Sequence, residues 1–219
     1  MFRDSPKYCT LHIYDEIDEA FAKYLISRIK SFAKSRQPIY LTLNISTHGG
    51  YLEPALSLAK AIKSYPWPVR AIGGSVESSA VVIFCVCQYR VLWDDGHIAA
   101  HNAFYVDKNG RRLKPRSRKS TSELQDLNVD QARIISFATG QQEDTISMLL
   151  DIDVEIPPDE ALKTGFTDAT VNDRTSKFVK TAWRPDIFLQ QKIKNYGDRH
   201  EIVVDKSVDM ETWRRSNTP

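Results

Sequence analysis

Four groups of residues along the chain are of the types that a serine hydrolase needs. They are the glycine pair Gly49-Gly50, then Ser78, His101 and Asp153. A serine hydroxyl becomes a good nucleophile when a neutral imidazole takes its proton, and a carboxylate can orient that imidazole. Two glycines at a turn allow a substrate backbone to approach N–H groups, which can stabilise an oxyanion. The set therefore predicts acyl-transfer chemistry.

Each of these residues also has a simpler structural interpretation. Ser78 precedes an apolar run, where a serine usually caps a helix, and a glycine pair often marks only a tight turn. His101 lies at the end of a predicted strand, where a lone histidine is more often a packed or exposed residue than a base. Asp153 lies in an acidic stretch, where a carboxylate is normally a solvated surface charge. Taken one at a time, these residues favour the structural interpretation, so the motifs around them decide between the two.

The surrounding pattern alternates between strands and helices, as in a mainly parallel sheet built from β-α-β units. The glycine pair and Ser78 each follow a predicted strand, and His101 ends one. Period-2 segments and β-rich runs predict strands, whereas apolar residues at helical spacing predict helices. The expected strands are 9–14, 39–45, 69–73, 89–93, 97–101 and 167–171, and the expected helices are 19–34, 52–62, 121–138, 142–150 and 157–162.

Composition excludes several other classes of protein. The 219 residues carry 30 Lys plus Arg and 28 Asp plus Glu, so a net charge of +2 argues against a dedicated nucleic-acid or membrane-surface protein. No apolar run reaches the roughly 18–20 residues of a membrane helix, and the first residues lack the pattern of a signal peptide. Three cysteines make no disulfide framework, so we expect reduced thiols, a cytoplasmic protein, and neither metal nor cofactor.

Specific motifs resemble the proteolytic subunit of Clp protease, a serine peptidase family that shares its superfamily fold with enoyl-CoA hydratases. IYLTLNISTHGG is similar to the family's strand and glycine turn, with Thr47-His48 in place of Ser-Pro. The family's G-x-A-A-S and M-I-H motifs correspond to Gly74–Ser78 and Ala99–His101. The most specific block follows in register and comprises Thr139-Gly140-Gln141, Asp153, Glu160-Ala161, Gly165 and Asp168. The resemblance covers about residues 9–171.

The resemblance implies a role for each candidate. Ser78 would attack a peptide carbonyl, His101 would act as base and then acid, and Asp153 would orient His101. The N–H groups of Gly50 and Ser79 would hold the oxyanion, and Gly49 would shape the turn beside the substrate.

The resemblance also implies an architecture and partners. We expect an α/β spiral of β-α-β units in a peptidase domain over residues 1–178, with an extension over 179–219. Within that extension, the pattern indicates a helix near 187–193 and a strand at 201–204. Helix 121–138 would protrude as a handle between subunits. Its apolar residues are expected to need a partner in a homo-oligomeric ring; they are Leu124, Leu127, Ala132, Ile135 and Ala138. Peptides or unfolded proteins would be the substrates, an AAA+ unfoldase is a candidate partner, and neither membrane nor nucleic acid is expected.

Glu77 and the basic segment 108–119 leave alternative interpretations open. Glu77 stands where the family has a small apolar residue; we expect its carboxylate to face away from the oxyanion site, yet it also supports a catalytically inactive ring subunit or binding module. A crotonase-type acyl-CoA enzyme would share the sheet and the oxyanion glycines. Segment 108–119 carries seven basic residues and no acid, so it is either a solvated loop or a surface for an anionic partner.

Overall fold

A six-stranded sheet organises the part of the chain that the computed structural model describes, which is residues 7–107, 109 and 111–171. Four parallel strands follow one another in sequence order: β1 (Lys7–Ile13), β2 (Ile39–Thr47), β3 (Val69–Glu77) and β4 (Tyr89–Ala100). On the far side of β4, β7 (Val154–Ile156) pairs with it antiparallel and β8 (Ala169–Val171) pairs with it parallel. The α/β class expected from the sequence is confirmed.

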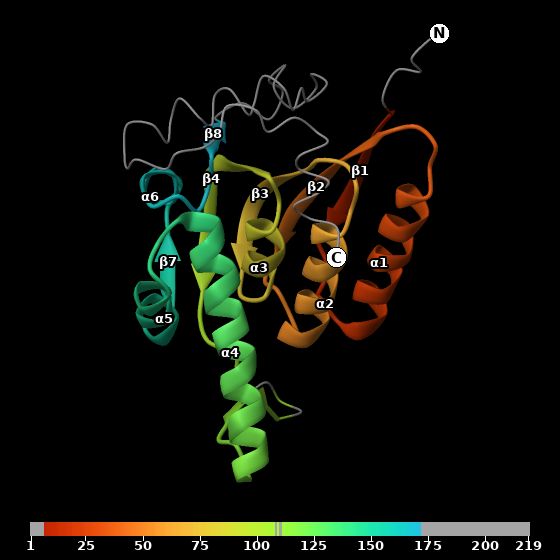
Figure 1. The fold of residues 1–219 in the computed structure, drawn as a ribbon. Helices are drawn as coiled ribbons and strands as arrows, with labels where there is room; N and C mark the ends of the chain where they lie inside the picture. The colour runs from red at the N-terminus through yellow and green to blue at the C-terminus, as the bar shows by residue number, and fades with distance from the viewer. Residues whose placement is uncertain (1–6, 108, 110, 172–219) are drawn as a thin grey trace, which may run out of the picture.

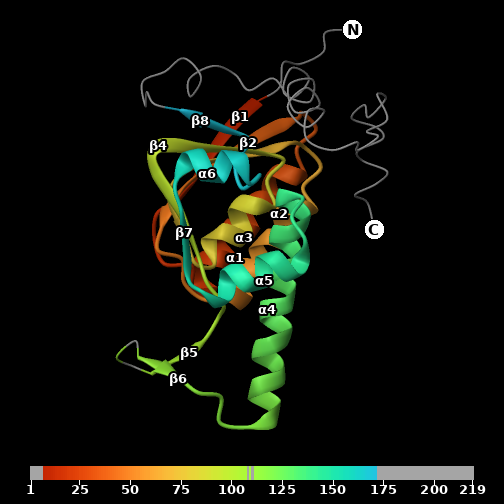
Figure 2. The ribbon, with the colours of Figure 1, turned by 90° about the vertical axis from the view of Figure 1, so that its left-hand side faces the viewer.

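Helices complete the β-α-β units. The first three are α1 (Glu19–Ala33), α2 (Leu52–Lys63) and α3 (Ala80–Cys85), and they lie together on one side of the sheet (Figure 1). Helices α5 (Glu143–Asp151) and α6 (Pro158–Lys163) lie near β7 (Figure 2). Helix α4 (Arg118–Thr139) extends well beyond the rest of the domain, beside a hairpin of β5 (Tyr105–Val106) and β6 (Arg112–Leu113) (Figure 2).

The core explains why the apolar run after Ser78 forms a helix in the middle of the domain. All six residues of α3 are buried, with at most 4% of any side chain exposed. They pack between the sheet and helices α2 and α4, against residues such as Leu43, Ile45 and Ile135. Because α3 begins directly behind the end of β3, burial of this helix fixes the turn that carries Ser78.

A buried ion pair ties the end of the described chain to the centre of the sheet. The Asp168 carboxylate accepts hydrogen bonds from Arg90 Nη2 at 3.1 Å, from Nε at 3.2 Å and from the backbone N–H of Arg90 at 2.9 Å. Only 1% of the Arg90 side chain and 4% of the Asp168 side chain are exposed. The pair therefore anchors β8 beside β4.

Three sequence-based expectations need correction. Residues 89–93 and 97–101, expected as two strands joined by a turn, form the single strand β4, in which one residue of β3 faces the four residues 93–96 as a bulge. Helix α4 begins at Arg118 rather than at 121, because Ser117 and Ser120 form a capping box. Residues 154–156 form β7, for which no strand was expected.

The remaining expectations concern the C-terminal segment, the cysteines and membrane-spanning helices. The expected helix at 187–193, the expected strand at 201–204 and the extension 179–219 all lie outside the described ranges. The three cysteines are free thiols, as expected. No helix within residues 7–171 that the structure describes offers an apolar stretch long enough to span a lipid bilayer.

Candidate active site

Ser78 occupies a strained turn between β3 and α3. Its backbone φ is +54°, a left-handed conformation that residues other than glycine rarely adopt. The N–H of Ser78 donates to the Ala99 carbonyl at 2.7 Å, and its own carbonyl accepts from Val81 N–H at 3.1 Å, so the turn is held at both ends. A serine in a sharp strand-to-helix turn is the geometry of a nucleophile elbow, and such strain is typical of functional sites.

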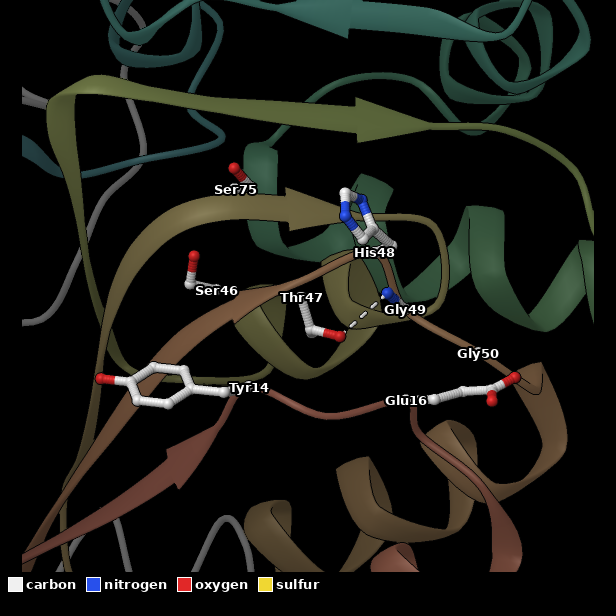
Figure 3. A pocket seen from close by; sticks show the side chains of 8 residues that line it. All are labelled: Tyr14, Glu16, Ser46, Thr47, His48, Gly49, Gly50 and Ser75. Carbon is white, nitrogen blue, oxygen red and sulfur yellow. Dashed lines mark hydrogen bonds between the residues drawn. The ribbon is translucent and has the colours of Figure 1, made fainter.

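Gly49 lies directly against this turn. A Cβ atom on Gly49 would lie 2.6 Å from the Glu77 carbonyl oxygen and 2.7 Å from Ser78 Cβ, and its φ is +92°. Both the conformation and the close approach therefore require glycine. Thr47 Oγ1 accepts from Gly49 N–H at 3.2 Å and donates to the Asp15 carbonyl at 2.8 Å, which holds the glycine loop in place (Figure 3).

The next residue, Gly50, presents an N–H group that the loop does not use. Ile17 N–H donates to the Gly49 carbonyl at 2.7 Å, and Tyr51 N–H donates to the Ile17 carbonyl at 3.0 Å, forming a parallel bridge between Ile17 and Gly50. In such a bridge the neighbours of Gly50 make the hydrogen bonds, and the N–H of Gly50 itself points to the opposite side. Within the described residues it has no backbone or side-chain acceptor.

Ser79 supplies a second free N–H. Among the described atoms, its backbone N–H donates no hydrogen bond, and it would lie 3.1 Å from a Cβ on Gly49. The Ser79 side chain is 98% buried, and its hydroxyl has no hydrogen-bond partner in the described part of the chain. A buried hydroxyl cannot reach a substrate, which favours Ser78 over Ser79 as the nucleophile.

Strand register brings the other two candidates to the same edge of the sheet. Glu77 pairs with Ala99, so Ser78 and His101 leave the adjacent strands β3 and β4 near the same level. In the antiparallel pair of β4 and β7, Ala100 lies opposite Val154. His101 is the residue after Ala100 and Asp153 is the residue before Val154, so the backbones at these two positions lie close together. Neighbouring strands are about 4.8 Å apart, so the backbones of all three candidates converge at one edge.

The side chains of His101 and Asp153 have other partners. His101 Nδ1 lies 2.8 Å from the Asn102 carbonyl oxygen. Because a carbonyl only accepts, Nδ1 must carry the proton, and in the neutral ring Nε2 keeps its lone pair. The Asp153 carboxylate instead accepts from Arg112 Nη2 at 2.8 Å. The hydrogen bond between His101 and Asp153 that a triad implies is therefore not formed in this arrangement, although the tautomer of His101 suits a base.

Arg112 and His101 are linked through an aromatic ring. The His101 ring stacks on Phe104 with centroids 5.1 Å apart, and the Arg112 guanidinium lies 4.0 Å from the centroid of the same Phe104 ring. Arg112 belongs to the basic segment 108–119, in which β6 and the start of α4 replace the continuous loop expected from the sequence. The basic segment thus reaches the candidate site.

Helices α4 and α5 hold the backbone that follows His101. Gln131, which is buried in α4, donates from Nε2 to the His101 carbonyl at 3.1 Å, and Asn128 accepts from Ala103 N–H at 2.7 Å. From α5, the Leu150 carbonyl accepts from Asn102 N–H at 3.1 Å. Sequence reasoning missed Gln131 and Asn128, because single polar residues on an amphipathic helix match no catalytic motif.

Glu77, the residue before the candidate nucleophile, has both carboxylate oxygens engaged. Oε2 lies 2.8 Å from His48 Nδ1, and Oε1 lies 3.1 Å from His97 Nε2. Burial raises the pKa of the Glu77 carboxyl, but the hydrogen bonds and charges of His48 and His97 outweigh this and lower it. The carboxylate is therefore held in an ion-pair cluster.

A cavity of about 400 Å³ lies beside the glycine loop. His48 stands above the loop, while the Glu16 side chain extends toward Gly50 (Figure 3). The cavity is lined by Tyr14, Glu16, Ser46, Thr47, His48, Gly49, Gly50 and Ser75. Among the described residues, no three or more His, Cys, Asp or Glu side chains are arranged to hold a metal ion.

Comparisons with known proteins agree with the resemblance noted in the sequence. The family model for Clp protease matches residues 7–174 of the chain. Among solved structures, a ClpP1 point mutant from Listeria monocytogenes is similar with a TM-score of 0.65 at 22% identity, covering 75% of this chain and 92% of that chain. No curated protein sequence matches. The structural likeness supports the same fold.

Proposed function

Because the chain belongs to the Clp protease family, we propose that it is a serine endopeptidase in which Ser78 is the nucleophile. The observation that carries this proposal is the strained turn at Ser78, packed against Gly49 and flanked by the unused N–H groups of Gly50 and Ser79. An oxygen atom bound between those two N–H groups would place its carbonyl carbon within reach of the serine.

The proposed reaction follows from the positions of the groups. Ser78 Oγ attacks the peptide carbonyl carbon while Nε2 of His101 takes the hydroxyl proton, and the N–H groups of Gly50 and Ser79 stabilise the resulting oxyanion. The intermediate collapses when His101 returns the proton to the leaving amine. Water, activated by the same imidazole, then hydrolyses the ester on Ser78. Asp153 orients and stabilises the imidazolium once it replaces the Asn102 carbonyl at Nδ1.

A fluorophosphonate probe tests this function directly, since it labels only an activated serine. We expect the purified protein to take up one probe per chain, and we expect labelled protein to lose hydrolysis of a fluorogenic peptide in proportion. Labelling should be blocked by prior incubation with excess peptide substrate. Protein that stays unlabelled while correctly folded would overturn the proposal.

A catalytically inactive ring subunit remains the second candidate, and one observation favours it. Asp153 is bound by Arg112 and His101 by its own neighbouring carbonyl, so the third member of the triad is displaced. The probe distinguishes the two candidates, because an inactive subunit would leave Ser78 unlabelled. If the protein is an active peptidase, the same geometry predicts that Arg112 lowers the rate of hydrolysis, because it binds the Asp153 carboxylate that would orient His101.

We therefore expect Arg112→Gln to raise kcat on a small peptide by up to about fivefold. The pair of Arg112 and Asp153 is about half exposed, and such pairs contribute at most about 1 kcal/mol, which is close to a fivefold change in population. Steady-state kinetics at low and high salt provide the measurement, and salt should activate the wild type more than the variant. Arg111→Gln, one residue away, serves as control. A fall in kcat for Arg112→Gln would contradict this role.

We also propose that the chain forms a homo-oligomeric ring that cleaves peptides or unfolded proteins, with an AAA+ unfoldase as candidate partner. The basis for assembly differs from the one expected in the sequence. Ala132 and Ile135 of α4 are buried within their own chain, so they need no partner. The most exposed large apolar side chains on and next to these helices are Phe137 of α4 at 86%, Met148 of α5 at 69% and Ile152, which follows α5, at 71%. Exposed groups of this kind mark contact surfaces.

Phe137→Glu is accordingly expected to shift the protein toward smaller species. In sedimentation experiments at micromolar concentration, the wild type should have a mass several times the 25.0 kDa of one chain. Tyr24→Glu, a matched change at an exposed ring on α1, should leave that mass unchanged. A wild-type mass near 25.0 kDa would refute assembly.

A further inference from the structure

Two of the positions where the sequence departs from the family motifs at the active site contact each other. His48 stands at the motif position of a proline and Glu77 at that of a small apolar residue, 29 positions apart along the chain. Their side chains meet with His48 Nδ1 2.8 Å from Glu77 Oε2. Glu77 keeps only 22% of its side chain exposed, whereas 94% of the His48 side chain is exposed. Because these two unusual residues form a hydrogen-bonded pair, we expect them to act together.

This contact links the two segments that supply the oxyanion hole. Gly50 follows His48 by two residues, and Ser79 follows Glu77 by two residues. Between them, Gly49 packs against Ser78, close enough that a Cβ would lie 2.7 Å from Ser78 Cβ. The glycine loop and the nucleophile turn thus lie side by side, with the ion pair at one end and the two free N–H groups at the other.

We propose that the ion pair between His48 and Glu77 sets the distance between the N–H groups of Gly50 and Ser79, so that His48 and Glu77 are positioning residues for the hydrolytic reaction. This inference rests on the proposed function. Neither side chain touches the reacting atoms. Each acts through the backbone two residues further along, because a small displacement of either segment misplaces one donor for the oxyanion.

The pKa values of His48 and Glu77 determine the pH range over which the ion pair forms. Glu77 raises the pKa of His48 through a hydrogen bond and its charge, and His48 and His97 together lower the pKa of Glu77 despite its burial. The other titratable groups facing this cluster are His97 on β4 and, from the segment after β1, Tyr14 and Glu16, which line the same cavity as His48.

The sign of the pH dependence follows. The link is complete above the lowered pKa of Glu77 and below the raised pKa of His48. As the pH rises through the pKa of His48 in the folded protein, the imidazole loses its charge and the link weakens. We therefore expect an alkaline fall in kcat that reports on His48 and that depends on Glu77.

The experiment compares Glu77→Gln, His48→Asn and the double variant with the wild type on a fluorogenic peptide. Each single variant should lower kcat about tenfold, less than loss of a whole oxyanion donor, with KM changed less than about twofold. The double variant should be no worse than either single one, because both remove the same link. The alkaline fall in kcat should disappear in all three variants. Asp159→Asn, which breaks an exposed ion pair with Lys163 on α6, is the matched control and should behave as the wild type.

An independent readout does not require turnover. Nuclear magnetic resonance titration of the His48 ring should give a lower pKa in Glu77→Gln than in the wild type, while Asp159→Asn leaves it unchanged. His97→Gln, which removes the other partner of Glu77 but lies far in sequence from either donor, should lower kcat less than Glu77→Gln does.

The outcomes separate this inference from the proposed function. A wild type that reacts with fluorophosphonate, together with variants whose kcat and pH profile match the wild type, would overturn the role of the pair and leave the peptidase proposal standing. Additive losses in the double variant, or changes confined to KM, would also overturn it. A wild type that takes up no probe would overturn both.

Discussion

Replacing Ser78 by alanine is expected to abolish fluorophosphonate labelling and to lower kcat on a peptide by about three to six orders of magnitude. The reason is that the strained turn aims one hydroxyl at the edge of the sheet, beside the free N–H groups of Gly50 and Ser79. Without the hydroxyl, only the oxyanion hole and substrate binding remain to accelerate hydrolysis. Stopped assays with a long time base, together with gel detection of the probe, provide the measurement.

Two neighbouring serines are matched controls for this experiment. Ser79→Ala removes a hydroxyl that is buried, and Ser75→Ala removes one that lines the cavity three residues earlier. Both variants should keep the label. Loss of labelling in Ser79→Ala together with retention of labelling in Ser78→Ala would show that Ser79, and not Ser78, is the nucleophile. Combining Ser78→Ala with His101→Ala should cost little more than either change alone, because members of a catalytic unit act together.

Arg90→Met is expected to cause the largest loss of stability of any single change considered, with the free energy of unfolding lowered by about 3–5 kcal/mol. The substitution leaves the Asp168 carboxylate, of which 4% is exposed, without the guanidinium that donates two hydrogen bonds to it. An uncompensated buried charge is costly because the protein interior solvates it poorly. Urea unfolding followed by circular dichroism gives the free energy directly.

The double variant Arg90→Met with Asp168→Leu tests the physical reason. Removing both charges should recover much of the loss, since the penalty comes from the unpaired charge rather than from the absence of the pair. Lys119→Gln, at an exposed pair with Glu123, should change the unfolding free energy by less than about 0.5 kcal/mol. An Arg90→Met protein as stable as the wild type would show that the pair does not anchor β8.

The backbone of the candidate site could be predicted from local sequence pattern. Apolar residues at period 2 in β2 and at helical spacing in α2 place Gly49 between a strand and a helix, and the same logic places Ser78 between β3 and α3. Such periodicity reports which face of an element is buried, and burial is the main driving force for these segments. The order of parallel strands then brings the ends of β2, β3 and β4 to one edge.

The local pattern did not predict that residues 89–100 form the single strand β4. Asp94-Asp95-Gly96 has the composition of a turn, yet it forms a bulge within β4, where a Cβ on Gly96 would lie 2.6 Å from the Gly74 carbonyl oxygen. Only pairing with β3 shows that the chain bulges there and does not reverse. Similarly, the apolar face of α4 looked unpartnered in the sequence, although α5 and the core cover Ala132 and Ile135.

Local sequence patterns predict the α/β class, the family, and the positions of Ser78 and His101 at the ends of strands, because these depend on patterns within a few residues. The position of Asp153 directly before β7 emerged only from the fold, since no strand was expected at 154–156. Which charged side chains contact one another depends on the folded backbone. Arg112 reaches Asp153 across 41 positions, and His48 reaches Glu77 across 29. Ion pairs form between side chains that the folded backbone brings within a few ångströms, and no local pattern encodes that distance.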